Sequence, residues 1–346
     1  MIQIGNRIIG EGHPAFIVGE VGQNHQGDVY TATRLFRMAA DAGCDAVKLC
    51  KRDIDSDLTR EAQNRPYEGP QSFGSTYGMH RRALELTPDE YSHLAERIRY
   101  NQWPMTLFAT ACDIKSVDEV EEAISPPLYK VASRDLDNLP LLTHIARLMK
   151  PIVLSGGMEI EGEIEQALNT IRKFHDQIIL CVCTSEYPTP NDHVGLCRIN
   201  EWRLRHRVEI GLSDHTPGIT AGIAAVALGA CYIEKHITLS RAMPGTDHAA
   251  SLEYEGLRRM VQKIREVEEM MKPLPELEHI TRRKLARSLV TTRDIQPGEI
   301  IEETDLCLKS PATGIKWAYR SLVVGKKSIG FIPSDTTLMP YDVEAS

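Results

Sequence analysis

The stretch IGLSDHTPGITAGIAAVALGACYIEKHITLSRAMPGTD, residues 210–247, decides the fold. An apolar run with strand character ends at Asp214 and His215, a Gly- and Ala-rich helical segment follows, and a second strand-like run carries His236. A helical crossover joins parallel strands, so the two histidines are expected at the same end of neighbouring strands, about 5 Å apart. A lone histidine at a strand end is more often a hydrogen-bonded structural residue, but two such imidazoles, with Asp214 and Asp247 nearby, favour a shared metal ion.

The same alternation of short apolar runs and amphipathic segments continues through the first 270 residues. Eight alternating units predict an α/β fold, a closed (β/α)₈ barrel, more readily than an open sheet. The expected strands are residues 15–22, 46–52, 105–111, 128–133, 151–157, 178–184, 208–214 and 231–238.

The pattern changes after residue 271. The prolines of KPLPELEHI predict a linker over 272–283 between a barrel domain, 1–271, and a small, largely β domain, 284–346. A domain of about 60 residues buries little apolar surface and needs support from another surface.

Composition excludes several classes of protein. The net charge of -8 gives no reason to expect a nucleic-acid partner. No apolar stretch is long enough to span a membrane, and the first residues lack a secretory leader, so we expect a cytoplasmic protein without a membrane partner. Eight cysteines without CxxC spacing indicate reduced thiols rather than a disulfide framework.

Polar side chains follow the predicted strands at the end where barrel enzymes carry their active sites. Lys48 and Lys130 are embedded in apolar strands and should point into the barrel mouth, where two lysines among hydroxyl groups suit phosphate and carboxylate groups. Glu20 is either an acid or base in a partly dry mouth or a carboxylate neutralised by Lys48. The other residues expected at this end are Thr110, Ser133, Asp135, Ser155, Ser185, Tyr187, Ser213, Asp214, His215 and His236.

A long polar segment, residues 53–86, separates the second and third predicted strands. Loops of this length are usually functional or disordered. Its aromatic, basic and glycine residues predict a loop that covers the substrate.

Ordered motifs across nearly the whole chain resemble the sialic acid synthase (N-acetylneuraminate synthase) family. They include EVGQNHQG at 20–27, CTSEYPTP at 183–190, GLSDHTPGI at 211–219 and IEKHITL at 233–239. The run RSLVTTRDIQPGEII, from residue 287, resembles the antifreeze-like (SAF) domain that follows the barrel in this family.

The resemblance implies condensation of phosphoenolpyruvate with the aldehyde of an N-acylated hexosamine, which gives a nine-carbon 2-keto-3-deoxy acid and phosphate. His215 and His236 would hold Mn²⁺ or Mg²⁺, and Glu20, Tyr187 and Asp247 would engage the sugar. The family's SAF domain caps the partner's barrel, which implies a domain-swapped homodimer. Residues implied to bind phosphoenolpyruvate are Lys48, Thr110, Lys130, Ser133, Ser155, Ser185 and Ser213.

Departures from the family pattern keep the acceptor and alternative functions open. Cys50 stands where members commonly have glutamine, Arg134 where the residue is usually small, and Ser310 where many bacterial members have arginine. The acceptor could be N-acetylmannosamine, its 6-phosphate or a diamino sugar leading to a legionaminic- or pseudaminic-type acid. The alternatives are a Schiff-base aldolase using Lys48 or Lys130 and a catalytically silent sugar-binding barrel.

Overall fold

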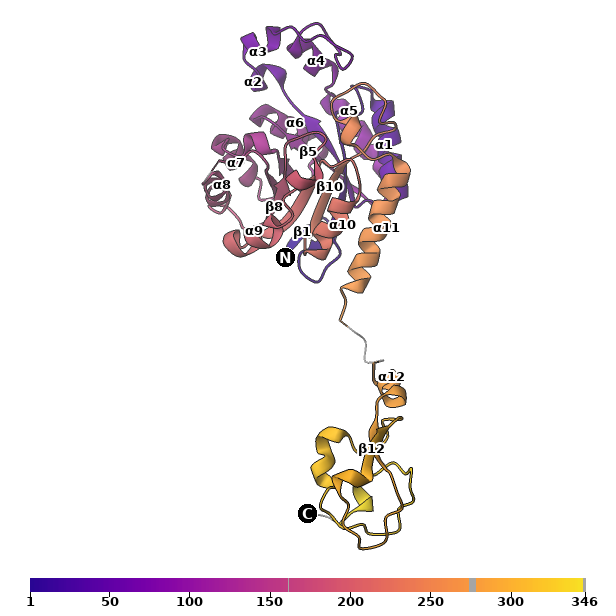
Figure 1. Ribbon diagram of the computed structural model, residues 1–346. Helices are drawn as coiled ribbons and strands as arrows, with labels where there is room; N and C mark the ends of the chain where they lie inside the picture. Colours follow the sequence, from indigo (N-terminus) through magenta and orange to yellow (C-terminus); the bar gives the residue numbers. More distant parts are fainter. Residues whose placement is uncertain (161, 274–277, 345–346) are drawn as a thin grey trace. The chain divides into compact units, whose positions relative to one another are not determined.

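Eight parallel strands close into a barrel within residues 1–271, one of two compact units of the chain. The structure is a computed structural model that describes all residues except 161, 274–277 and 345–346. The sheet closes where β10 pairs with β3, so the predicted (β/α)₈ barrel is confirmed (Figure 1). The strands are β3 (Phe16–Gly22), β4 (Ala46–Lys51), β5 (Thr106–Ala111), β6 (Tyr129–Val131), β7 (Ile152–Gly156), β8 (Ile178–Cys183), β9 (Glu209–Asp214) and β10 (Tyr232–His236).

One main helix follows each strand and covers the outside of the barrel, and local sequence signals fix several helix ends. Asp28 caps the first helix, and Gly43 ends it with φ of 85°, which glycine adopts without steric cost. Thr87 and Glu90 form a capping box at the next main helix. No helix in the described part of the chain is long and apolar enough to cross a membrane. The helices are α1 (Val29–Ala42), α5 (Pro88–Tyr100), α6 (Ile114–Ile124), α7 (Leu139–Ala146), α8 (Glu163–Ile171), α9 (Arg198–His206), α10 (Thr220–Ala227) and α11 (Tyr254–Met270).

An N-terminal hairpin that the sequence did not reveal closes the bottom of the barrel. Its strands β1 (Ile2–Ile4) and β2 (Arg7–Ile9) pair antiparallel. Ile4 and Ile9 are almost fully buried and belong to the same apolar cluster as Phe16 and Phe108 in the barrel interior. The hairpin therefore excludes water from the end of the barrel opposite the strand carboxyl ends.

The segment predicted as a long loop contains regular structure. Residues 53–86 form α2 (Ile54–Asp57), α3 (Arg60–Asn64) and α4 (Tyr77–Ala83), which Figure 1 shows grouped at the end of the barrel away from the N-terminus. The loop expected here thus includes short helical turns, which side-chain caps stabilise, such as that of Thr76 on the backbone of Met79. Coverage of the substrate by this segment stays a prediction.

The second compact unit, residues 272–346, has its own small core. It begins with α12 (Glu278–Leu285), so part of the linker expected over 272–283 is helical. An antiparallel pair, β11 (Ser288–Thr291) and β12 (Leu306–Lys309), carries short 3₁₀ turns and isolated bridges around it. Leu289, Ile295, Ile301, Val323 and Leu338 form its buried centre.

The hairpin gives a stability prediction with an internal control. Ile9 is buried whereas its neighbour Ile8 is 48% exposed. Ile9→Ala should lower the free energy of unfolding of the barrel by about 2–5 kcal/mol, because a buried side chain is lost and a cavity remains. Ile8→Ala should change it by less than about 0.5 kcal/mol. Urea unfolding followed by tryptophan fluorescence measures both, and equal effects would contradict a buried role for the hairpin.

Candidate active site

Side chains inside the barrel separate into an apolar floor and a polar mouth. The floor includes Phe108, Leu128, Val153 and Tyr232. Alternate residues of a strand share one face, so the side chains two positions further along point into the same interior. These polar residues are Lys48, Thr110, Lys130, Ser155, Ser213 and Glu234, all buried.

A cluster of two lysines and two carboxylates occupies the centre of the mouth. Lys48 Nζ lies 2.7 Å from Glu20 Oε2 and donates a 2.7 Å hydrogen bond to Thr110 Oγ1. Lys130 Nζ donates to Glu234 Oε1 at 2.9 Å. Because Lys130 is on β6 and Glu234 on β10, strands that are not neighbours, this bond crosses the barrel interior.

The two carboxylates of the cluster have opposite protonation tendencies. Burial would raise the pKa of Glu234, but Lys130 and Lys48 outweigh it and hold the pKa well below its usual range. Glu234 also accepts hydrogen bonds from the Tyr232 hydroxyl at 2.6 Å and from Ser213 at 3.1 Å. At Glu20 burial dominates and raises the pKa to about 8, although Lys48 acts against it. Glu234 therefore carries the negative charge, and Glu20 takes up a proton more readily than an ordinary carboxyl group.

The two predicted histidines lie together at the mouth, with ring centroids 5.5 Å apart. His215 Nδ1 lies 2.7 Å from the Thr184 carbonyl, which leaves Nε2 facing the Tyr187 hydroxyl at 2.9 Å. Burial lowers the pKa of His236 to about 3, so its imidazole is neutral. Asp247 Oδ2 is 4.0 Å from His236 Nδ1, and no described residue makes a hydrogen bond to that nitrogen.

Hydroxyl groups near Cys183 line another part of the mouth. Ser133 Oγ accepts a 3.0 Å hydrogen bond from the Gly157 backbone. A Cβ added at Gly157 would meet the hydroxyls of Ser133 and Ser185 at 2.7 and 2.8 Å, so glycine is required for their close approach. Ser155 Oγ is buried, and none of the described residues bonds to it. Its hydroxyl is therefore available to a ligand.

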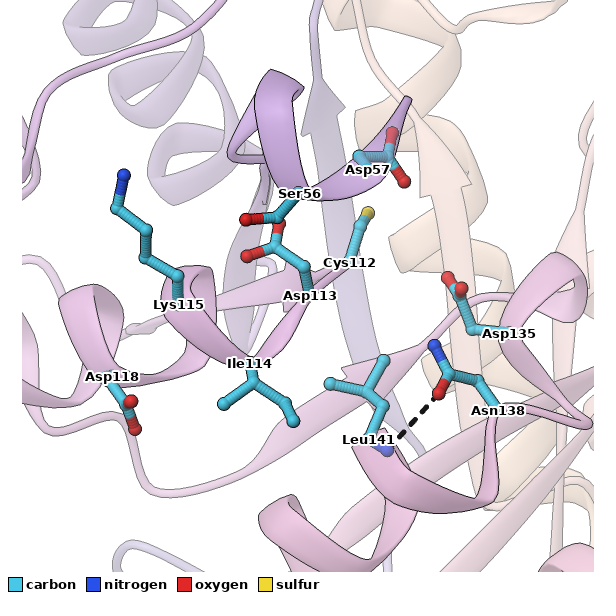
Figure 2. Close-up of a pocket in the computed structure, with 10 residues that line it drawn as sticks. All are labelled: Ser56, Asp57, Cys112, Asp113, Ile114, Lys115, Asp118, Asp135, Asn138 and Leu141. Carbon is cyan, nitrogen blue, oxygen red and sulfur yellow. Dashed lines mark hydrogen bonds between the residues drawn. The ribbon is translucent and has the colours of Figure 1, made fainter. Parts of the chain in front are cut away.

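Asp135, also expected at the site, lies in a neighbouring pocket of about 630 Å³. Figure 2 shows this pocket, with Asp135 and Asn138 facing Ser56 and Asp57 of α2. Burial raises the pKa of Asp135 to about 6, and Arg134 Nε lies 3.4 Å from its Oδ2. Asp135 thus borders the mouth without joining the lysine and glutamate cluster.

Comparisons with known proteins identify the family of the chain. The model of the NeuB family matches residues 35–274, and that of the SAF domain matches residues 286–344. The chain belongs to the NeuB family. It is 36% identical to N-acetylneuraminate-9-phosphate synthase of Homo sapiens, over 96% of this chain and 94% of the relative. It is also 36% identical to N,N'-diacetyllegionaminic acid synthase of Campylobacter jejuni, over 86% and 91%.

A solved structure has the same architecture. The N-acetylneuraminic acid synthetase of Leptospira borgpetersenii, crystallised with citrate, superposes with a TM-score of 0.71 at 30% identity, covering 82% of this chain and 95% of that one. The family resemblance expected from the motifs is therefore confirmed, and with it the expectation of a synthase-type enzyme.

One residue expected at the NeuB site points elsewhere. Asp214 lies between two inward-facing residues, Ser213 and His215, so the pleat turns its side chain to the outside of the barrel. There Asp214 Oδ2 accepts a 2.9 Å hydrogen bond from the buried Lys235, and Oδ1 accepts one from the Thr216 backbone. A catalytic role for Asp214 is corrected to a structural one, which fixes the loop that carries His215.

The sequence pattern did not predict Glu234, whose carboxylate forms ion pairs with both Lys48 and Lys130. Its signal was present, because Glu234 stands two residues before His236 and so shares its face of β10. Cys183, two residues before Ser185, also faces the mouth and accepts a 3.6 Å hydrogen bond from Ser133. In the sequence IEKH, Glu234 and Lys235 resemble a solvent-exposed ion pair. Only the closed barrel shows that both are buried.

Removal of the Glu234 charge should destabilise the folded barrel. Glu234→Gln keeps the shape but leaves two buried lysines short of a counter-charge, so we expect the barrel to lose about 3–5 kcal/mol of unfolding free energy. Tyr232→Phe removes one hydrogen bond to the same carboxylate and should cost about 1.5–3 kcal/mol. Chemical denaturation measures both values. A Glu234→Gln barrel as stable as the native one would refute this role.

Proposed function

We propose that this chain condenses phosphoenolpyruvate with the aldehyde of an N-acylated hexosamine and releases phosphate. The observation that carries the proposal is the juxtaposition of Lys48 and Lys130 with two imidazoles in one mouth. The names of the relatives support an amino-sugar-derived acid as the product class.

The lysine side of the mouth suits the phosphate and carboxylate of phosphoenolpyruvate. Lys48 and Lys130 supply charge, and the hydroxyls of Thr110, Ser155 and Ser213 supply hydrogen bonds in fixed positions. These groups orient C3 of phosphoenolpyruvate toward the aldehyde carbon. Water then adds at C2, and the tetrahedral intermediate expels phosphate.

The histidine side suits a divalent ion. His215, whose Nδ1 is held by the Thr184 carbonyl, and His236, neutral and with an uncommitted ring nitrogen, would hold Mn²⁺ or Mg²⁺ together with oxygen ligands. In the described residues no three His, Cys, Asp or Glu side chains form a complete metal cluster, so substrate or water would supply the remaining ligands. When bound, the ion supplies a Lewis acid that polarises the aldehyde oxygen.

The acceptor sugar would meet Glu20, Tyr187 and Asp247. Burial raises the pKa of Glu20 to about 8, which suits it to give a proton to the aldehyde oxygen as the carbon–carbon bond forms. The candidates remain N-acetylmannosamine, its 6-phosphate and a diamino sugar of the legionaminic or pseudaminic type. Arg81 and Arg82, from the segment 53–86, are the candidates to bind a 6-phosphate. Arg82 contacts Asp55 at 2.6 Å, whereas Arg81 bonds the neutral Gln23.

The ion pairs of the two lysines argue against an aldolase with a Schiff base. That chemistry needs a neutral amine. Burial acts against the charged form of Lys48, but Glu20 and Glu234 outweigh it and raise the pKa. Borohydride with a keto substrate should therefore trap no adduct. The domain-swapped homodimer implied by the SAF domain stays a prediction, which a measurement of the mass in solution tests. The silent sugar-binding barrel also stays a prediction, and the assay below tests it.

Phosphate release should require both an acyl-hexosamine and a divalent ion. We expect turnover with Mn²⁺, loss of it with a chelator, and a fall of at least roughly a hundredfold in His215→Ala and His236→Ala. His93→Ala, which changes an exposed histidine of α5, is the control. A panel of the three acceptor types identifies the sugar. Sugar binding without phosphate release would instead favour the silent barrel.

Ser155 separates substrate binding from stability. No described residue bonds its hydroxyl, so Ser155→Ala should leave the unfolding free energy within about 0.5 kcal/mol. It should raise the KM for phosphoenolpyruvate about tenfold, the cost of one hydrogen bond to a charged group. Ser133→Ala, which also loses the bond from Gly157, should lower stability as well. An unchanged KM in Ser155→Ala would place the phosphoenolpyruvate site elsewhere.

A further inference from the structure

Two thiols meet at the rim of the mouth. Cys50 lies near the end of β4, and Cys112 directly follows β5, the neighbouring strand. Their sulfurs are 3.8 Å apart. Both residues continue the inward-facing positions of their strands, Cys50 two residues after Lys48 and Cys112 two residues after Thr110.

The surroundings make one of the two thiols reactive. The hydrogen bond from Cys112 lowers the pKa of Cys50 well below that of an ordinary thiol, and Arg52, Lys48 and Arg134 act in the same direction against burial. Cys112 is the opposite case, because that hydrogen bond and burial raise its pKa. A thiolate beside a protonated thiol is the arrangement of an attacking cysteine and its resolving partner.

A small oxidant can reach the pair. Cys50 is partly exposed. Cys112 lines the pocket of about 630 Å³ described above, and Figure 2 shows its sulfur on the side that carries Asp57. The exposed Cys197, in contrast, precedes α9 on another part of the barrel.

We propose that Cys50 and Cys112 form a reversible redox site that a peroxide converts to a disulfide. The Cys50 thiolate attacks one peroxide oxygen, the O–O bond breaks, and after proton uptake water (or an alcohol, from an alkyl peroxide) leaves with Cys50 as a sulfenic acid. The Cys112 thiol then attacks the Cys50 sulfur, its proton joins the leaving hydroxyl, and a second water departs. The two thiols lose two electrons and the peroxide gains them. A dithiol reverses the reaction.

Disulfide formation should disturb the mouth. The sulfurs must approach from 3.8 Å to about 2.05 Å, so the two side chains must shift beside Lys48 and Thr110, which hydrogen-bond each other. Cys50 is also the direct register partner of Thr110. The oxidised protein is therefore expected to bind the anionic substrate poorly; this activity readout rests on the proposed function, whereas the disulfide itself does not.

Peroxide treatment of the full chain, followed by alkylation and peptide mass analysis, tests the site. We expect a cross-linked peptide pair containing Cys50 and Cys112, lighter by two hydrogens, that disappears with a dithiol. Phosphate release should fall in parallel by roughly tenfold to a hundredfold in kcat/KM, as expected when binding groups move by about 1 Å, and should recover on reduction.

Matched variants decide the assignment. Cys112→Ser should remove the cross-link and leave Cys50 as a sulfenic acid that a dimedone-type reagent labels, while Cys197→Ser should form the cross-link as the native chain does. Failure to form the cross-link at peroxide levels that oxidise Cys197 would overturn the proposal. So would the absence of sulfenic acid labelling at Cys50 in Cys112→Ser. A cross-link without any measurable synthase turnover would support the redox site and count against the proposed function alone.

Discussion

The structure depends on how two lysines are kept inside a closed barrel. Removing an ammonium group from water is costly, and only a close carboxylate with further hydrogen bonds makes it tolerable. Glu234 meets this need for both Lys130 and Lys48, while Tyr232 and Ser213 satisfy its remaining oxygen lone pairs. Burial favours the protonated form of Glu20, so Glu234 is the main negative charge opposite the two lysines. The excess positive charge is what an anionic substrate would neutralise.

The barrel holds this arrangement in place from both sides. Below it, the hairpin isoleucines and the floor residues exclude water and lower the local dielectric, which strengthens each charge interaction. Outside it, the fully buried Lys235–Asp214 pair anchors the turn after β9. That turn and the Thr184 carbonyl fix the ring orientation of His215. The histidines are thus positioned by parts of the fold that never touch substrate.

The positive charges of the mouth also act on the cysteine pair at its rim. The cations that suit an anionic substrate also stabilise a thiolate, since Lys48 faces the mouth and Arg52 lies beside Cys50. The glutamine expected at this position from the family resemblance could not form a disulfide. The departure at Cys50 therefore changes the chemistry available at the rim, while the charge cluster beside it is intact.

The sequence by itself determined the eight βα units, the SAF domain, the family, and most residues of the mouth. Strand periodicity and strand-end position suffice for these, as the inward-facing Lys48, Lys130, His215 and His236 show. Strand periodicity also implied that Asp214 faces outward, but its place beside His215 concealed this.

Only the tertiary structure decided which side chains contact one another. Glu234 bridges lysines from strands far apart in sequence, and the hairpin docks against floor residues from several strands. The approach of Cys50 to Cys112 likewise depends on the register between β4 and β5. Periodicity tells which face of a strand a residue occupies, but contacts across a barrel depend on closure and register, which no local pattern encodes.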